Sequence, residues 1–233
     1  MLLFESTNIV YHYFLMLGIP LSPYSLIIIG GKAPNSFSMP SERYKKIVAA
    51  DSGFDTALDL GISPDLVVGD FDSTGKRELI EGFLHKSAIK DKDESDFELA
   101  LIDVCGPYDL IGGGEGRLDH LVAIMSLFHK YGVPRLWFTR EDVIIGVNSA
   151  LSMALPLNST ISIFALDEAN VVTNGLVWEL GEKKLNRSFM SLSNRNKDSK
   201  VRIQTDAPIL VRVDSQVCSE LSLEWTSLAE DIS

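Results

Sequence analysis

Cysteine, basic residues and long apolar runs are all scarce in this sequence of 233 residues. The two cysteines, Cys105 and Cys218, lie far apart and outside any Cys/His array, which excludes a zinc site of the usual spacing and argues against a disulfide scaffold. We interpret both as small buried hydrophobic residues. Lys and Arg number 21 against 32 Asp and Glu, a formal net charge of −11. Such a surface repels nucleic-acid phosphates, so nucleic-acid binding is not expected.

No apolar run approaches the roughly 18 residues that a membrane span needs, so no membrane segment is expected. The stretch 10–17, VYHYFLML, is apolar, but it follows Glu5 and has no Lys or Arg before it. A secretory signal begins with positive charge, so we expect a cytoplasmic protein. Residues 1–24 form an N-terminal extension of unknown role, either a docking segment or an overlong start.

The pattern along the chain predicts two domains. With 45% hydrophobic and 23% charged residues, the composition is that of an ordinary globular protein, and the pattern changes near residue 150. In 25–150, short β-branched runs alternate with helical periodicity, which predicts an α/β domain with a mostly parallel sheet flanked by helices. The expected strands are 25–31, 45–51, 65–70, 109–114, 135–139 and 143–147, and the expected helices are 54–61, 94–104 and 116–132.

Residues 151–233 show a different pattern, without a clear helix before the last ten residues. Short β runs occur at 159–166, 175–180, 188–193, 200–205 and 208–214, and several of them alternate apolar and polar positions. Such alternation is typical of half-buried antiparallel strands. We therefore expect an all-β sandwich in this part of the chain.

The segment GDFDS (69–73) directly follows an apolar strand-like run. In an open parallel sheet, ligands bind beyond the carboxyl ends of the strands, so Asp70 and Asp72 are placed where catalysis is expected. If the chain is extended there, both side chains point to the same face. Two carboxylates about 4 Å apart repel by roughly 1–4 kcal/mol, a cost that bound Mg²⁺ removes. The alternative is a pair of solvated turn aspartates.

A second acidic cluster, DKDESD (91–96), precedes an expected helix. Ser95 and Glu98 form a capping box, and the helix macrodipole favours Asp96 in the first turn. Capping does not need four acids in six residues, because they repel one another. The functional alternative is that one acid of this cluster, which also contains Asp93, faces a metal and another faces a cationic or hydrogen-bonding substrate.

The segment GGGEGRLDH (112–120) reads as a strand exit, a glycine loop and a helix that begins near Arg117. Glycines let backbone N–H groups approach phosphates, and a helix N-terminus adds partial positive charge. The Walker pattern is absent. The Arg117 guanidinium suits phosphate, and Asp119 can join a metal or ligand shell. The alternatives are a glycine turn without a ligand and, for His120, an ordinary helix residue.

All three features fall at strand exits of one α/β layer, and together they suit metal-assisted phosphoryl or pyrophosphoryl transfer. With these motifs, the sequence resembles the thiamin pyrophosphokinase family. The resemblance covers about residues 25–215, and the segments that carry it are PDLVVGDFDS (64–73), KDESDFELAL (92–101), GGGEGRLDH (112–120), NGLVWEL (174–180), SLSN (191–194) and DAPIL (206–210).

The resemblance implies a division of labour between the two domains. Residues 25–150 would be a catalytic domain that binds nucleotide and metal, and 151–233 a β-sandwich that contributes to a thiamin pocket. The reaction implied is transfer of a diphosphate from ATP to the thiamin hydroxyl with Mg²⁺, which gives thiamin diphosphate and AMP. The resemblance also implies a homodimer with active sites between the subunits.

Carried over position by position, the resemblance assigns roles to thirteen residues. The metal ligands would be Asp70, Asp72 and Asp96, which with Asp93 form the catalytic set. The ATP-binding residues would be Asp51, Gly113, Gly114, Arg117, Asp119 and His120. The thiamin-binding residues would be Lys92, Asp96, Ser193 and Asn194. Trp178 matches a family aromatic, although core packing explains it equally well.

The sequence departs from the family pattern at 50–55. The family usually has a run like A-D-G-G-A-N, whereas this chain has ADSGFD: Ser52 replaces a glycine, and Phe54 and Asp55 replace the small residue and Asn. We therefore expect the nucleotide contacts of this loop to differ. Ser95 stands where Thr is usual, which keeps the hydroxyl.

Two other functions fit the same residues. A metal-dependent phosphohydrolase would use the same acids with water as the acceptor. A non-catalytic sensor on the same scaffold would bind thiamin or nucleotide without releasing AMP, and the departure at 50–55 is the reason to consider it.

Overall fold

The computed structural model describes residues 24–37, 43–88, 93–181 and 184–226. The chain divides into two compact units between Glu141 and Asp142, rather than near residue 150. We call residues 24–141 the N-terminal unit and residues 142–226 the C-terminal unit. The expected extension at 1–24, except for its last residue, lies outside the described residues.

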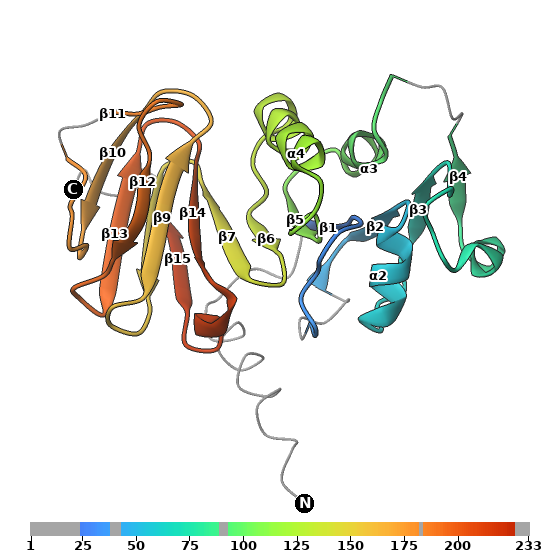
Figure 1. Ribbon diagram of the computed structural model, residues 1–233, viewed down its shortest axis with the longest axis horizontal. Helices are drawn as coiled ribbons and strands as arrows, with labels where there is room; N and C mark the ends of the chain where they lie inside the picture. Colours follow the sequence, from blue (N-terminus) through green and yellow to red (C-terminus); the bar gives the residue numbers. More distant parts are fainter. Residues whose placement is uncertain (1–23, 38–42, 89–92, 182–183, 227–233) are drawn as a thin grey trace, which may run out of the picture. The chain divides into compact units, whose positions relative to one another are not determined.

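The N-terminal unit contains the parallel sheet that the sequence predicted (Figure 1). Within this unit the strands lie in the order β6-β5-β1-β2-β3-β4, and each neighbouring pair is parallel. Their bounds are β1 Ser25–Ile28, β2 Lys46–Ala50, β3 Leu66–Gly69, β4 His85–Ser87, β5 Tyr108–Ile111 and β6 Leu136–Phe138. Every residue of β1, β3, β5 and β6 is buried, which explains why these strands are mostly apolar in sequence.

Among the described residues of this unit, the helices are α2 Gly53–Asp59, α3 Asp96–Val104 and α4 Leu118–Tyr131, together with the 3₁₀-helix η2 Arg77–Gly82. The three α-helices confirm the helices expected from periodicity. Ser95 caps α3, because its hydroxyl accepts a hydrogen bond from the Glu98 N–H at 3.2 Å. The Glu98 carboxylate is directed elsewhere and accepts hydrogen bonds from Lys130 and Tyr131 of α4.

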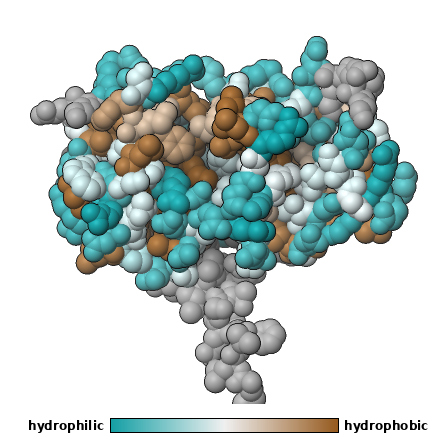
Figure 2. Space-filling model, viewed as in Figure 1, coloured by the Kyte–Doolittle hydropathy of each residue, from teal (hydrophilic) through white to brown (hydrophobic). Residues whose placement is uncertain are grey.

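The first half of α4 carries apolar side chains that are exposed in this chain. Leu118, Leu121 and Val122 expose 76%, 42% and 60% of their surface, whereas Ile124 and Phe128 are buried. Figure 2 shows apolar side chains on the surface over α4. Contiguous exposed apolar surface of this kind marks interaction sites more often than chance.

The C-terminal unit is all β, as predicted, and consists of antiparallel strands (Figure 1). One set lies in the order β12-β9-β14-β7 and the other in the order β11-β10-β13-β8-β15. Their bounds are β7 Asp142–Val147, β8 Ala150–Ala154, β9 Thr160–Ala165, β10 Ala169–Asn174, β11 Lys184–Leu185, β12 Ser191–Arg195, β13 Lys200–Thr205, β14 Ile209–Asp214 and β15 Ser222–Thr226, with a 3₁₀-helix η3 at Ser215–Val217. Burial alternates strictly along β9, β10 and β13, so one face of each strand meets the core.

Several details differ from the sequence predictions. The strand expected at 143–147 forms as β7 but pairs with β14 in the C-terminal unit. Residues 175–180 are not a strand but a turn with one bridge, Leu176 to Asn196, and the strand expected at 188–193 begins only at Ser191. The helix considered for the last ten residues is wrong as far as Thr226, where β15 ends; residues 227–233 lie outside the described part.

The cysteines also differ from expectation. Both thiols are free, but Cys105 is exposed and Cys218 is half-buried, so neither is a fully buried core residue. Cys105 caps α3 in a left-handed conformation (φ 43°), which brings its side chain out at the end of the helix. Every helix in the described part of the chain is too short or too polar to cross a membrane.

The packing of α2 against the sheet depends on Gly53. A Cβ added at this position would lie 2.1 Å from the Ile28 carbonyl oxygen, and backbone atoms there cannot move aside. We expect Gly53→Ala to lower the free energy of unfolding by about 1–3 kcal/mol. The matched control is Gly82→Ala, which meets no atom within 4 Å and should change stability by less than about 0.5 kcal/mol. Equal urea-unfolding midpoints for the two variants would contradict this account of the packing.

Candidate functional site

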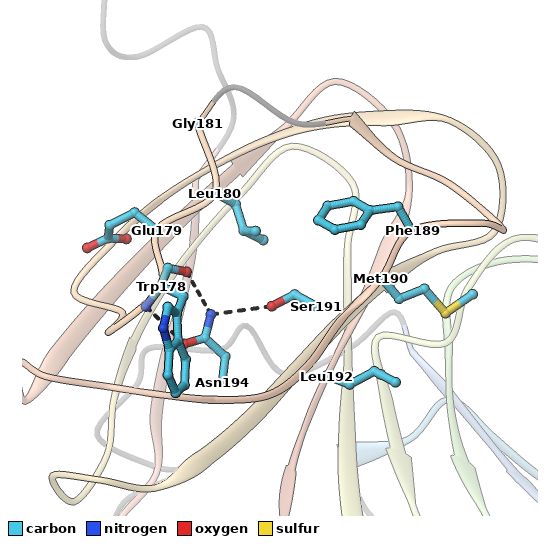
Figure 3. Close-up of a pocket in the computed structure, with 9 residues that line it drawn as sticks. All are labelled: Trp178, Glu179, Leu180, Gly181, Phe189, Met190, Ser191, Leu192 and Asn194. Atoms are coloured by element: carbon cyan, nitrogen blue, oxygen red, sulfur yellow. Dashed lines mark hydrogen bonds between the residues drawn. The ribbon is translucent and has the colours of Figure 1, made fainter.

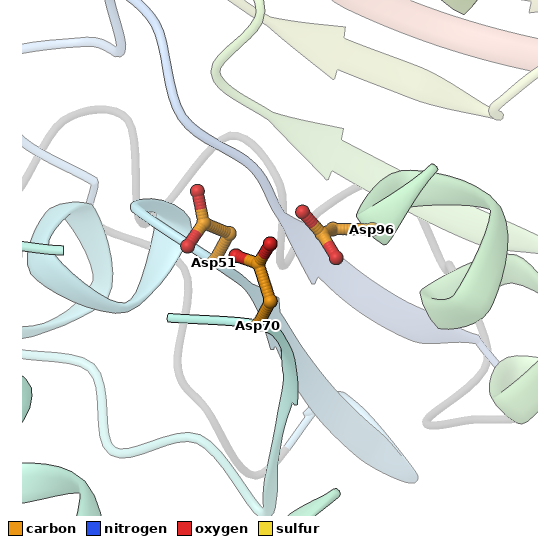
Figure 4. A group of neighbouring side chains, drawn as sticks. All are labelled: Asp51, Asp70 and Asp96. Atoms are coloured by element: carbon orange, nitrogen blue, oxygen red, sulfur yellow. The ribbon is translucent and has the colours of Figure 1, made fainter. Parts of the chain in front are cut away.

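Three carboxylates converge at the ends of two neighbouring strands (Figure 4). Asp51 directly follows β2, Asp70 directly follows β3, and Asp96 is the first residue of α3. Each offers a carboxylate oxygen, and these oxygens all lie within 4.8 Å of one another. We call Asp51, Asp70 and Asp96 the acidic cluster.

Gly69 makes this convergence possible. Its backbone has φ +139°, and a Cβ there would lie 3.2 Å from Asp96 Oδ1 and 3.3 Å from the Cα of Asp51. A side chain would therefore push the strand ends apart or displace Asp96. The backbone N–H of Asp51 donates to the Val68 carbonyl at 2.8 Å, which holds the two strand ends in register.

The electrostatics of Asp51 indicate a missing positive partner. Burial raises the pKa of Asp51, and the nearby Asp96 charge raises it further, while hydrogen bonds from Ser52 and Ser73 lower it. Asp51 Oδ1 is buried and has no hydrogen-bond partner among the described residues. Elsewhere in the same sheet, the buried Asp109 is matched by Arg135, whose Nε and Nη2 donate at 2.9 and 2.5 Å. Carboxylate oxygens are the ligands that Mg²⁺ prefers, so the acidic cluster fits a divalent cation.

Asp72, which the sequence analysis paired with Asp70, does not belong to the acidic cluster. Phe71 has φ +60°, so the chain is not extended and the two side chains do not share a face. Asp70 Oδ1 instead accepts the Asp72 N–H at 3.1 Å, and the exposed Asp72 carboxylate accepts the Ser73 hydroxyl at 3.0 Å. The structure brings Asp70 together with Asp51, a residue that had been assigned to ATP.

A cavity of about 430 Å³ lies beside the acidic cluster and contains most of the expected nucleotide residues. Its polar lining includes Asp51, Ser52, Ser73, Ser95, Asp96, Gly113, Gly114, Arg117 and His120, and its apolar lining includes Ile29, Phe97, Ile124 and Leu127. Asp93 is exposed and is not among the lining residues, and Lys92 lies outside the described residues. We call this space the strand-end cavity.

The glycine loop is built for close packing. A Cβ at Gly112 would lie 2.1 Å from the Ile29 carbonyl, and one at Gly114 would lie 2.7 Å from Thr139 Cβ. The N–H of Gly112 donates to the Phe138 carbonyl and that of Gly113 to the Gly30 carbonyl, at 3.0 and 2.7 Å. The expectation that the loop amides bind phosphate therefore does not apply to these two N–H groups, because both are used inside the protein.

Arg117 and Asp119 stand at the start of α4 as an exposed ion pair. The Arg117 guanidinium donates to the Asp119 carboxylate through Nε at 3.1 Å and also through Nη2. This pairing lowers the pKa of Asp119 and raises that of Arg117. Arg117 also lines the strand-end cavity, so a bound anion would compete with Asp119 for the guanidinium.

A second pocket, of about 560 Å³, lies in the C-terminal unit (Figure 3). It is lined by Trp178, Glu179, Leu180, Gly181, Phe189, Met190, Ser191, Leu192 and Asn194. The Trp178 side chain is 54% exposed, so core packing does not explain it. We call this space the Trp178 pocket.

Asn194 lines the Trp178 pocket, and the amide group of its side chain binds the Trp178 backbone. It is buried, its Oδ1 accepts the Trp178 N–H at 3.2 Å, and its Nδ2 donates to the Trp178 carbonyl at 2.7 Å. Its neighbour Ser193 has φ +54° and donates its N–H to the Ser162 hydroxyl, and it does not line the pocket.

Glu179 was not singled out from the sequence, yet it fixes the same turn. It accepts the N–H groups of Gly175 and Leu176 and the hydroxyl of Thr173 at 3.0, 3.1 and 2.8 Å. Lys197 is the ion-pair partner of Glu179. Partial burial raises the pKa of Glu179, but the hydrogen bonds that its carboxylate accepts lower the pKa below its usual value. Thr173, Gly175 and Leu176 belong to the same local turn, and only Lys197 comes from another segment of the chain.

The raised pKa of Asp51 gives a signed prediction. Without divalent cations, the native state holds the Asp51 proton more tightly than the unfolded chain does, so the stability this proton contributes is lost as pH rises from 3.8 through the raised pKa. We expect Asp51→Asn to remove that loss and to be more stable than the wild type at neutral pH. Added Mg²⁺ or Mn²⁺ at a hundredfold excess over Kd should stabilise the wild type by about 2.7 kcal/mol and the variant much less.

Asp72→Asn is the matched control for this experiment, because Asp72 is exposed and outside the acidic cluster. It should keep the wild-type pH profile and cation response in thermal unfolding. If stabilisation by the cation is lost in Asp72→Asn and kept in Asp51→Asn, the cation is bound by Asp70, Asp72 and Asp96, as expected from the sequence, and not by the acidic cluster.

Two family models match the chain. Residues 40–137 match the thiamin pyrophosphokinase catalytic domain, and residues 145–210 match the thiamin pyrophosphokinase vitamin B1 binding domain. The first match contains the acidic cluster, and the second contains the Trp178 pocket. Comparison with curated proteins finds no match.

Three solved structures of similar fold carry the same family name. A thiamin pyrophosphokinase family protein from Enterococcus faecalis is 22% identical, with a TM-score of 0.68 over 83% of this chain and 99% of that chain. The thiamine pyrophosphokinase from Bacillus subtilis is 21% identical, with a TM-score of 0.67 over 82% and 98%. The yeast thiamin pyrophosphokinase is 15% identical, with a TM-score of 0.62 over 86% and 88%. With the fold shared and both halves matched by family models, the chain belongs to the thiamin pyrophosphokinase family of enzymes.

Proposed function

We propose that this enzyme transfers a diphosphate group from ATP to the hydroxyl of thiamin in the presence of Mg²⁺, giving thiamin diphosphate and AMP. The observation that carries the proposal is the acidic cluster beside the strand-end cavity, in a chain whose other half matches a vitamin B1 binding domain. The cytoplasmic location expected from the sequence is part of the same proposal.

The acidic cluster is the proposed metal site. Asp51, Asp70 and Asp96 would hold Mg²⁺, in place of the set with Asp72 that the sequence suggested. When bound, Mg²⁺ supplies positive charge to the phosphate oxygens at the reacting centre. The buried Asp51 Oδ1, without a protein partner, supports this assignment. Asp72 and Asp93 are exposed, and their catalytic roles stay predictions.

The proposed nucleotide site is the strand-end cavity. Arg117 would leave Asp119 and bind phosphate oxygens, while Gly113, Gly114 and His120 line the wall beside it. The thiamin hydroxyl oxygen attacks the β-phosphorus, and the bond from that phosphorus to the oxygen bridging to the α-phosphate breaks. AMP leaves with that oxygen, and the hydroxyl proton is released. The protein contributes mainly positioning and charge stabilisation.

We assign thiamin recognition in the C-terminal unit to the Trp178 pocket. The exposed Trp178, Phe189 and Leu192 offer apolar and aromatic surface, and the indole face suits the cationic thiazolium. Asn194 would act by holding the Trp178 backbone, since its amide is already hydrogen-bonded on both sides. Ser193 does not line this pocket, and Lys92 lies outside the described residues; both stay predicted thiamin contacts.

The test of this function is an assay of AMP release from Mg·ATP, with and without thiamin, in which thiamin diphosphate is followed by chromatography. We expect equal amounts of AMP and thiamin diphosphate, and Asp70→Asn should lower kcat by about a hundredfold or more because a ligand of the charged centre is lost. AMP or phosphate released without thiamin would contradict the proposal in favour of a hydrolase. Binding of both ligands without AMP release would favour a sensor.

The proposed assembly is a homodimer, and the exposed stripe of Leu118, Leu121 and Val122 on α4 is the surface we assign to the second copy. We expect Val122→Asp to convert the dimer to monomer in sedimentation velocity at micromolar concentration, because a charge would be desolvated in the interface. Leu79→Asp, which changes an apolar residue of similar exposure outside this stripe, should leave the dimer intact. A monomeric wild type, or a dimer unaffected by Val122→Asp, would contradict the assignment.

A further inference from the structure

Asp55, the last residue of the unusual ADSGFD run, does not line the strand-end cavity. Its carboxylate instead contacts the chain just beyond GDFDS. The Thr74 hydroxyl donates to Asp55 Oδ1 at 2.5 Å, and the Gly75 N–H donates to Oδ2 at 2.6 Å. Both carboxylate oxygens are therefore used by one turn, residues 74–76.

Lys76 completes the connection between this turn and α2. Its ammonium donates to the Asp55 carbonyl at 3.4 Å and to the Asp59 carboxylate at 2.5 Å. Its backbone N–H donates to the Thr74 hydroxyl at 3.2 Å. Three successive residues are thus joined to the helix through side-chain hydrogen bonds.

The helix that holds the turn is itself firmly packed. Phe54 and Ala57 are fully buried, and Gly53 leaves no room between α2 and the Ile28 carbonyl. Since α2 cannot shift against the sheet without cost, a turn joined to α2 is fixed relative to the strand ends.

The turn continues directly from the loop that reaches the acidic cluster. Ser73 precedes Thr74 and lines the strand-end cavity together with Asp51. At the other end of the loop, Asp70 follows β3 and accepts the Asp72 N–H. The short stretch 70–73 therefore runs from a fixed strand end to a turn that Asp55 holds.

We propose that Asp55 is a positioning residue: by clamping the turn 74–76 to α2, it fixes Ser73 in the wall of the strand-end cavity, beside Asp51 of the acidic cluster. The proposal rests on the proposed function for its effect on turnover. It also gives the Asp in ADSGFD a role inside the protein rather than at the nucleotide.

A clamp at position 55 requires a side chain that can hydrogen-bond to both Thr74 and Gly75. Asn at this position can accept the Gly75 N–H with Oδ1 and donate from Nδ2 to the Thr74 hydroxyl oxygen, so it preserves both contacts. Ala preserves neither. If the role depended on negative charge, Asp55→Asn would lose function as Asp55→Ala does. If the role is a clamp, Asp55→Asn behaves like the wild type and only Asp55→Ala loses function.

The experiment compares Asp55→Ala, Asp55→Asn and Asp59→Ala. Asp59 is the matched control, because it lies on the same helix, is exposed, and contacts the turn only through Lys76. We expect Asp55→Ala to lower kcat by about tenfold or more with little change in the KM for thiamin, because the reacting groups are misplaced. Asp55→Asn should stay within about threefold and Asp59→Ala within about twofold of the wild type.

Two measurements without turnover separate this proposal from the proposed function. In the protein without ligands, amide hydrogen exchange at Gly75 should be about tenfold faster in Asp55→Ala, and at the wild-type rate in Asp55→Asn. Calorimetric Mn²⁺ affinity should fall in Asp55→Ala alone. If the wild type makes no AMP, the proposed function fails while these two measurements still decide the clamp.

Wild-type exchange at Gly75 and wild-type Mn²⁺ affinity in Asp55→Ala would overturn the proposal, as would equal loss of kcat in Asp55→Asn and Asp55→Ala. If Asp55→Ala does not fold, Thr74→Val removes one of the two contacts. That variant should then show the same pattern to a smaller degree, and wild-type behaviour in it would overturn the clamp.

Discussion

Repulsion among three carboxylates is the constraint around which the N-terminal unit is arranged. Asp51, Asp70 and Asp96 hold their nearest oxygens within 4.8 Å, although burial already disfavours the charge of Asp51. The surrounding residues keep this unfavourable arrangement in place. Gly69 provides the space, the β2–β3 ladder fixes the register, and Ser95 caps the helix that presents Asp96. The negative charge concentrated here favours binding of a cation, which would offset the repulsion among the three carboxylates.

The same region shows why several glycines are needed for close packing. At Gly53 and Gly112 an added Cβ would collide with a carbonyl oxygen of the β1 segment. The helix and the glycine loop can therefore pack directly against the strand ends. This close packing sets the walls of the strand-end cavity, and it uses the N–H groups of Gly112 and Gly113 for the fold rather than for a ligand.

In both units, hydrogen bonds to polar side chains hold the segments beside the pockets. Asp55 holds the turn beyond the GDFDS segment, and Asn194 with Glu179 holds the turn that carries Trp178. Loops that end a strand lack the ladder hydrogen bonds of regular structure, so side-chain hydrogen bonds take their place. A ligand-facing group can then be exposed and still have a defined position.

The sequence by itself determined the features that depend on local spacing: the parallel strands, the three α-helices, the Ser95 cap, the all-β second half and the family. It also located the acids at strand ends. Only the tertiary structure decided that Asp51, and not Asp72, joins Asp70, because a left-handed Phe71 turns the chain after β3. It likewise decided that 175–180 is a turn, that Asn194 holds a backbone segment, and that half of α4 is exposed. The left-handed turn at Phe71 is a backbone conformation that periodicity does not reveal, and the other features depend on contacts between residues far apart in the chain, about which local periodicity carries no information.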